Sequence, residues 1–403
     1  MGSEQRRQME TEAIHAGEIH DPSGAHVAPI YQTSTFTFDS MKAVEEMASG
    51  EAEAYVYARG GSPARTALAN KLAALESYGL GSESQPVSAE IFSSGMAAIS
   101  AALMGLARAG DHIVTQQALY GSADHLISSV LSEYGITNSR IAGLEAGALE
   151  RELEEHPNTT AVYLETPANP TLIVIDIART AEIAHSHGVR VVVDNTFATP
   201  VLQRPLEHGA DVVVHSTTKY INGHGTVIGG AVISGDAQLM EDKIASLIRY
   251  TGGVPSPFDC WLTNLGLKTL PLRMRQHCVN AGAVARFLDS HPAVAATSYP
   301  GLPDHPQHEI AGKQMEGFGA MIAFDLGGYK AATRFLDRIE LATLAVSLGN
   351  IDTLVEHPAS MTHSVVDPED RAASGITDGL VRMSVGLEAV DDIITDLDQA
   401  LAG

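Results

Sequence analysis

The sequence is poor in cysteine and in positive charge. Its 403 residues contain two cysteines, Cys260 and Cys278, which excludes a disulfide framework and makes a reducing cytoplasm the expected compartment. Lysine and arginine together number 25 against 49 acidic residues, giving a formal net charge of −24. Such an excess of negative charge repels phosphate backbones and anionic lipids. We therefore expect neither nucleic acid nor a membrane as a partner.

Long apolar runs and metal-binding spacings are also missing. No apolar stretch reaches the roughly 20 residues that a membrane-spanning helix needs, and the polar residues 1–12 lead us to expect no secretory signal. The 17 histidines, His357 and His363 among them, stand in no HExxH motif, and no CxxC motif occurs. We therefore predict no metal site. Hydrophobic residues make up 44% of the chain, enough for a substantial core.

The chain divides into three segments by pattern. Residues 1–63 look irregular and carry few periodic apolar positions, so we expect an arm that lies on another surface, such as that of a second subunit. Residues 64–264 alternate short apolar strands with helices. Residues 265–403 contain fewer strands and begin with a long helix predicted over 272–290. We interpret the last two segments as a large domain and a smaller α+β domain.

The strands of the large domain are short and apolar. They are predicted at 89–92, 112–115, 160–164, 190–194, 211–215 and 229–233, with helices between most of them. This rhythm is typical of an α/β fold, with a mostly parallel sheet and helices on both faces. Ligands of such sheets bind beyond the carboxyl ends of the strands.

Lys219 is the most informative residue of the chain. It follows the strand at 211–215 and a turn that contains Ser216 and Thr218, and Asp194 ends another strand 25 residues earlier. Adjacent strands would place the amine and the carboxylate at one edge of the sheet. Pyridoxal phosphate (PLP) needs an amine for a Schiff base, an acid facing its ring nitrogen and an anion cradle. Considered alone, Lys219 could be a solvated loop charge and Asp194 a helix cap. The pair at this spacing favours PLP.

Further residues could complete such a site. The turn Ser94-Gly95-Met96 joins a strand to a helix, where backbone N–H groups attract an anion, although it also fits a plain tight turn. Tyr120 follows a strand and could stack on a pyridine ring and move protons, or could simply pack. Arg382, inside an apolar strand, needs a partner: a substrate carboxylate or a structural ion pair.

Tyr57 and Arg59 lie in the arm. An arginine beside a phenol can bind phosphate. As isolated residues of an arm they would be surface contacts, so their role depends on where the arm docks.

Several segments together resemble the Cys/Met-metabolism family of PLP-dependent enzymes. They are ETPANP (165–170), VVVDNTF (191–197), QRPL (203–206), GAD (209–211), HSTTKYINGH (215–224), YPGL (299–302) and SVGLE (384–388). The resemblance runs from about Ala13 to Leu401. It implies the aspartate-aminotransferase-like fold (fold type I) and a homotetramer of tight dimers, in which the arm of one subunit completes its neighbour's site.

The resemblance also implies roles for individual residues. Lys219 would hold PLP as a Schiff base, Asp194 would pair with the ring nitrogen and Asn169 would contact the ring hydroxyl. Tyr120 would stack on the ring and act as a general acid. The remaining expected contacts are Gly95, Met96, Ser216 and Thr218 with the phosphate, Tyr57 and Arg59 with the phosphate of the partner's site, and Arg382 and Ser347 with the substrate carboxylate.

The choice of substrate depends on few positions. The stretch 344–350 resembles methionine γ-lyases, and Val346 stands where cystathionine enzymes commonly carry an acid. Ser122 departs from the cysteine of bacterial methionine γ-lyases, and residues 253–260 lean toward cystathionine lyases. The resemblance thus implies γ-elimination of L-methionine to methanethiol, 2-oxobutanoate and ammonia. The alternatives are cystathionine γ-lyase or γ-synthase activity, O-acetylhomoserine sulfhydrylase activity and, more distantly, a non-catalytic scaffold.

Overall fold

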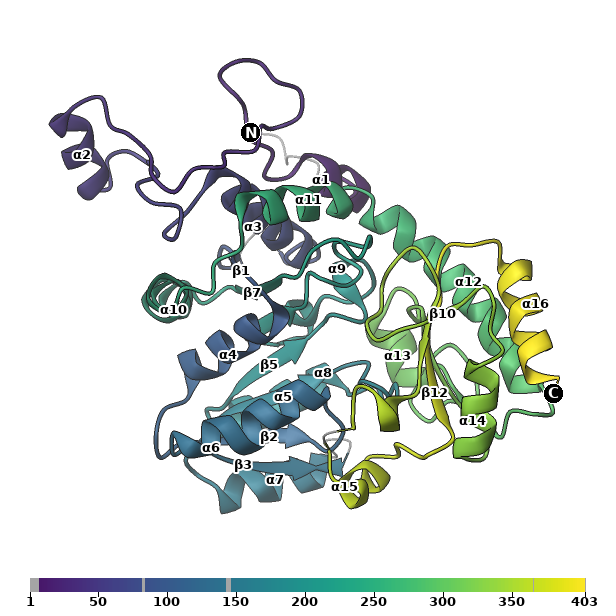
Figure 1. Cartoon of the computed structure of the whole chain (residues 1–403). Coiled ribbons are helices and arrows are strands. Elements are labelled where there is room, and N and C mark those ends of the chain that lie inside the picture. The colour runs from purple at the N-terminus through teal and green to yellow at the C-terminus, as the bar shows by residue number, and fades with distance from the viewer. Residues whose placement is uncertain (1–6, 82–83, 143–145, 365, 403) are drawn as a thin grey trace.

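Two β-sheets organise the chain, one large and one small (Figure 1). A computed structural model describes residues 7–81, 84–142, 146–364 and 366–402. The strands are β1 (Ser88–Phe92), β2 (His112–Gln116), β3 (Thr137–Ile141), β4 (Thr159–Glu165), β5 (Arg190–Asp194), β6 (Val212–His215), β7 (Gly230–Ser234), β8 (Ala296–Ser298), β9 (Met321–Asp325), β10 (Thr343–Leu344), β11 (Leu354–Glu356) and β12 (Leu380–Ser384).

Most of the α-helices connect or cover these strands. They are α1 (Met9–His15), α2 (Met41–Ala48), α3 (Pro63–Glu76), α4 (Gly95–Leu106), α5 (Gly121–His125), α6 (Leu131–Glu133), α7 (Ala146–Glu155), α8 (Ile177–Ser186), α9 (Thr199–Leu202), α10 (Ala245–Thr251), α11 (Pro257–Leu267), α12 (Leu270–Ser290), α13 (His308–Gln314), α14 (Tyr329–Leu336), α15 (Pro368–Ala373) and α16 (Val390–Leu401). Among the described residues, none of the helices is long and apolar enough to cross a bilayer.

The large sheet has seven strands in the order β1-β7-β6-β5-β4-β2-β3. Only β7 runs against its neighbours β1 and β6, so the predicted mostly parallel sheet is confirmed. Helices cover both faces. Along β5, Val192 belongs to the apolar cluster of α4, whereas Val191 and Val193 belong to that of α8. Successive strand residues point to opposite faces, which explains why β5 is apolar throughout.

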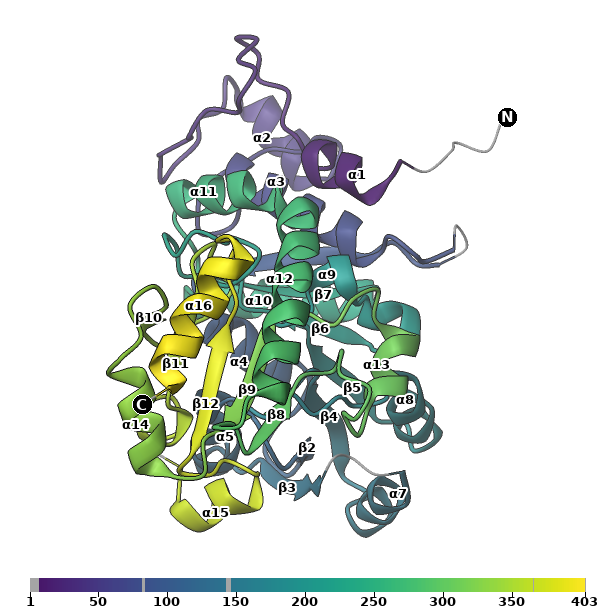
Figure 2. The same ribbon diagram turned by 90° about the vertical axis from the view of Figure 1, so that its right-hand side faces the viewer.

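The small sheet follows the large one in the chain. Its strands have the order β10-β11-β12-β9-β8. The β10–β11 pair is parallel, and every other neighbouring pair is antiparallel. Helix α12 packs along β8 and β9 and also contacts α16 (Figure 2). Its predicted start at 272 is two residues late, because Pro271 sits in the first turn, a position that suits proline. All five strands of this sheet come after residue 265.

The expectation that residues 1–63 are irregular is wrong at two places. Helix α1 buries Met9 and Ala13 against a core that includes α3, and α2 begins where the Ser40 side chain accepts the N–H of Ala43 at 3.2 Å. These helices are too short to give a clear apolar period. Between these helices and α3 the chain runs through turns and irregular segments, and α2 projects from the body of the molecule (Figures 1 and 2). No residue of α2 is buried.

Candidate active site

A cavity of about 360 Å³ lies where the carboxyl ends of β4, β5 and β6 face the small sheet. Most of the residues predicted for the PLP and substrate sites line it. They are Gly95, Met96, Tyr120, Asn169, Asp194, Ser216, Thr218, Lys219, Val346, Ser347 and Arg382. Strand-end positions far apart in sequence thus meet at one edge of the sheet, as parallel topology requires.

Lys219 ends the turn after β6. Its backbone N–H donates to the carbonyl of Ser216 at 3.2 Å, and its Nζ donates to Ser347 Oγ at 2.8 Å. Burial, assisted by the positive charge of Arg382, lowers the pKa of the Lys219 amine to about 8. A larger share of the amine is therefore uncharged near neutral pH, which is the state that a nucleophile or a proton acceptor needs.

Two carboxyl groups stand side by side at this edge. The register of β4 and β5 places Glu165 opposite Asp194. Burial raises the pKa of the Glu165 carboxyl well above its usual range, and the charge of Asp194 adds to this effect. Burial also raises the pKa of Asp194, although hydrogen bonds from Thr196 oppose the shift. Such a pair attracts a cation, and a protonated ring nitrogen would be one.

The first turn of α4 and the turn after β6 together form an anion cradle. Ser94 caps α4 by accepting the N–H of Ala97 at 3.0 Å. A Cβ on Gly95 would lie 2.8 Å from the Cβ of Ser216, so the two turns touch closely only because residue 95 is glycine. The N–H of Ser216 donates to Thr196 Oγ1 at 2.8 Å, and the Thr218 hydroxyl donates to the carbonyl of Gly229 at 3.2 Å. Gly95 and Met96 at the start of α4 line the cavity together with Ser216, so the positive end of this helix lies at the cavity.

Arg382 on β12 is 2% exposed, and both terminal nitrogens of its guanidinium have hydrogen-bond partners. Its Nη1 donates to Asn169 Oδ1 at 2.8 Å, and its Nη2 donates to the carbonyl of Ser347 at 2.7 Å. It also forms an ion pair with Glu356 at 3.1 Å. Within the described part of the chain its Nε has no hydrogen-bond partner. A guanidinium that lines the cavity is suited to a carboxylate.

Tyr120 is held through its backbone. Its N–H lies 3.0 Å from both carboxyl oxygens of Glu165, and the residue, which is 37% exposed, lines the cavity. The phenol is therefore accessible to a ligand. Glu165, Thr196 and Thr362 also line the cavity, and sequence reasoning did not single them out. Glu165 begins the ETPANP motif, which was a usable signal.

Three predicted residues do not join the cavity within one chain. Ser122 lies in α5, just beyond Tyr120, and is not among the described residues that line the cavity. The same holds for Tyr57 and Arg59, which stay in the arm: Tyr57 forms a β-bridge with Thr35, and the Arg59 guanidinium lies 5.5 Å from the Tyr57 ring centre.

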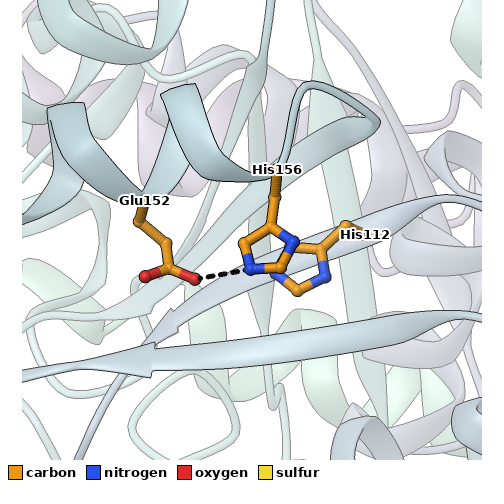
Figure 3. A group of neighbouring side chains, drawn as sticks. All are labelled: His112, Glu152 and His156. Carbon is orange, nitrogen blue, oxygen red and sulfur yellow. Dashed lines mark ion pairs between the residues drawn. The ribbon is translucent and has the colours of Figure 1, made fainter.

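A group with metal-ligand chemistry lies elsewhere, at His112, Glu152 and His156 (Figure 3). The two imidazole rings stack at 4.1 Å with an angle of 5°, and both nitrogens of His112 contact the hydroxyls of Thr137 and Ser139. Imidazole binds a metal in the plane of its ring, and lone pairs in parallel planes do not converge on one ion. The arrangement favours packing over chelation.

Comparison with known proteins agrees with this geometry. The model of the family described as Cys/Met metabolism PLP-dependent enzyme matches residues 10–402. The chain belongs to this family. An L-methionine γ-lyase of Porphyromonas gingivalis is 49% identical over 97% of this chain and 96% of the relative. A cystathionine γ-synthase of Mycobacterium bovis is 44% identical over the same shares.

A solved structure is similar as well. The cystathionine γ-lyase of Lactobacillus plantarum, complexed with L-serine, superposes with a TM-score of 0.89 at 40% identity, covering 98% of this chain and 99% of the other. Membership of the family makes PLP the cofactor of this protein. The amine, the paired carboxyls and the anion cradle described above fit it.

Proposed function

We propose that the protein cleaves L-methionine by γ-elimination, releasing methanethiol, 2-oxobutanoate and ammonia. The observation that carries the proposal is the set of charges in the cavity. Among the described lining residues, the Asp, Glu, Lys and Arg side chains are Glu165, Asp194, Lys219 and Arg382. Lys219 and Asp194 serve the cofactor, Arg382 serves the substrate carboxylate, and Glu165 accepts the N–H of Tyr120. None of these four side chains is left to bind the ammonium and carboxylate of a second amino-acid group in the substrate.

The outer part of the site supports the same substrate. A second hollow of about 280 Å³ shares Thr218, Ile228, Val346 and Ser347 with the cavity, and its described lining residues are all uncharged. The distal ammonium and carboxylate of cystathionine would lose water there without partners, at a cost of a few kcal/mol. The methyl thioether of methionine carries no such groups. The L-methionine γ-lyase name of the P. gingivalis relative agrees.

Each residue would contribute a defined part of the chemistry. Gly95, Met96, Ser216 and Thr218 would hold the phosphate of PLP, and Asn169 would contact its ring hydroxyl. Asp194 would pair with the ring nitrogen. When bound, PLP withdraws electrons from the substrate α-carbon.

The remaining residues handle substrate and protons. Arg382 and Ser347 hold the substrate carboxylate and thereby orient the α-carbon. Lys219 Nζ, with its pKa lowered to about 8, accepts the α-proton. The phenol of Tyr120 donates a proton to the departing sulfur.

The arm belongs to the same proposal. We infer a division into an arm (1–63), a large domain (64–264) and a small domain (265–403), and a homotetramer in which Tyr57 and Arg59 reach the phosphate of a neighbouring subunit. Two features support it. Tyr57 is 48% exposed with Arg59 beside its ring, and α2 leaves Met41 71% exposed. Exposed apolar residues gathered on one segment mark an interaction surface.

A substrate panel tests the proposal. The purified protein, loaded with PLP, is incubated with methionine, cystathionine, homocysteine, cysteine, or O-acetylhomoserine plus sulfide, and 2-oxobutanoate, pyruvate and thiol are quantified. We expect methionine to give 2-oxobutanoate and methanethiol in equal amounts. The second candidate, cystathionine chemistry, has the 44% identity of the M. bovis relative in its favour. It would show as 2-oxobutanoate plus cysteine from cystathionine with little turnover of methionine.

A further inference from the structure

Glu356 is a buried carboxylate just behind the cavity. It is the last residue of β11 and lies directly opposite Arg382 in the register of β11 and β12. Its exposure is 0%, and Oε1 pairs with Arg382 Nη1 at 3.1 Å. Burying a carboxylate is costly unless it is paired and hydrogen-bonded. The position therefore calls for an explanation beyond packing, because an apolar residue would fill the space at lower cost.

The same carboxylate is tied to the segment that follows it. Glu356 Oε1 accepts the hydroxyl of Thr362 at 2.7 Å, and Thr362 lines the cavity. The Thr362 hydroxyl also lies 3.0 Å from His363 Nδ1, and His363 Nε2 lies 3.3 Å from the carbonyl of Leu119. Leu119 precedes Tyr120. A continuous set of contacts thus runs from the guanidinium on the small sheet to the residue before the tyrosine on the large one.

We propose that Glu356 is a positioning residue, which fixes the Arg382 guanidinium for the substrate carboxylate and offsets its charge beside Lys219. The inference rests on the proposed role of Arg382 as the carboxylate-binding residue. Two effects follow. Loss of the carboxylate group frees the guanidinium to move, which weakens binding of any amino acid. Loss of its charge alone leaves Arg382 uncompensated next to the Lys219 nitrogen, which favours the unprotonated form of that nitrogen.

Two substitutions separate these effects. Glu356→Gln keeps an acceptor for Thr362 and for Arg382 but removes the charge, whereas Glu356→Ala removes both. L-norleucine, in which a methylene replaces the sulfur of methionine, serves as a probe, because its binding changes the visible spectrum of the PLP-loaded protein without turnover. The pH midpoint of the same spectrum in the absence of amino acid reports on the Lys219 nitrogen. KM and kcat for methionine are measured in parallel.

We expect Glu356→Ala to weaken norleucine binding about tenfold or more and to raise KM for methionine in proportion, with kcat changed far less. The affinity of Glu356→Gln for norleucine should lie within threefold of the wild-type affinity. It should also lower the pH midpoint by roughly half a unit or more, because a neighbouring negative charge has gone. If Glu356→Gln keeps its norleucine affinity while the pH midpoint of its spectrum shifts, Glu356 does more than stabilise the fold, because a purely structural residue would not give this combination.

Asp211→Asn is the matched control. Asp211 pairs with Arg190 at 3.0 Å where β5 and β6 begin, at the opposite end of the sheet from the cavity. If both Glu356 variants match this control in norleucine affinity and in pH midpoint, the proposal is wrong. If Glu356→Ala does not fold, Thr362→Val decides: it should weaken norleucine binding severalfold and leave the pH midpoint unchanged, and unaltered affinity would overturn the proposal. Because the probe is not turned over, a wild type that binds norleucine but does not cleave methionine counts against the proposed function alone.

Discussion

Lys219 and Ser347 touch across the two sheets, with Nζ 2.8 Å from Oγ. Ser347 has a φ of +89°, a conformation that residues with side chains rarely adopt. Two residues on, a Cβ on Gly349 would lie 2.5 Å from the backbone nitrogen of Tyr220, the neighbour of Lys219. The loop is therefore packed closely against the turn that carries Lys219, and its strained serine contacts the Lys219 amine. Backbone strain of this kind is concentrated at functional sites.

The first prediction concerns this amine. The purified protein should be yellow, and borohydride should fix PLP to it covalently. Lys219→Ala should abolish the trapped adduct because no other described lysine lines the cavity. Peptide mapping of the reduced protein identifies the modified residue. A colourless wild type that cannot be reconstituted with PLP would contradict the assignment and favour a scaffold.

The second prediction concerns the arm. Arg59→Ala should weaken PLP retention, although Arg59 is not among the described lining residues of its own chain's cavity. Inactive Arg59→Ala and inactive Lys219→Ala subunits, mixed and allowed to exchange, should regain part of the activity, because a hybrid dimer contains one intact shared site. Subunit exchange is checked with differently tagged chains. Exchange without recovery would show that each site is built from one chain.

The third prediction concerns the outer pocket. Val346 is 50% exposed beside uncharged residues, and Val346→Glu would place a carboxylate there. We expect lower kcat/KM for methionine and higher kcat/KM for cystathionine, each by a factor of 10 to roughly 1,000. The competing view is that Ser122 has already moved the protein away from methionine. Ser122→Cys would then raise methionine turnover sharply, while Val346→Glu changed little.

The fourth prediction concerns acid stability. His277 is fully buried, its Nδ1 lies 2.8 Å from the carbonyl of Val385, and burial lowers its pKa to about 4. The unfolded chain, with a histidine pKa near 6.5, binds the proton more readily. Stability is therefore lost as the pH falls from about 6.5 to 4.

Urea unfolding of the PLP-free protein at pH 7 and pH 5 checks this, at one protein concentration. His277→Gln does not titrate, so it should lose about 2 kcal/mol less than wild type between the two pH values. The comparison uses differences between pH values, so any fixed cost of the substitution cancels. Equal losses in both proteins would mean that His277 does not contribute to acid sensitivity.

The sequence was sufficient for features that depend on local pattern. The strand around Val192 is apolar on both faces, so its place in a parallel sheet could be predicted, and with it the meeting of Asp194 and Lys219 at one edge. Glu356 and Thr362 could not be found this way. Their importance comes from the register of β11 against β12, which exists only in the folded sheet, and from the contact of the neighbouring His363 with Leu119, 244 residues earlier in the chain.

The structure of the arm could be predicted from the sequence only in part. Tyr57 and Arg59 were selected through the resemblance, and a single chain does not bring them to the cavity. The short helix α2 escaped prediction because eight residues hold too few turns for a periodic signal. Their position at a cofactor site depends on the proposed contact with a neighbouring subunit.

The most direct test of the central claim is the ratio of kcat/KM for L-methionine to that for L-cystathionine in the unmodified, PLP-loaded protein. An uncharged outer pocket predicts a ratio well above one, by tenfold or more. A protein that cleaves cystathionine far better than methionine would contradict the claim without contradicting the proposed PLP site at Lys219.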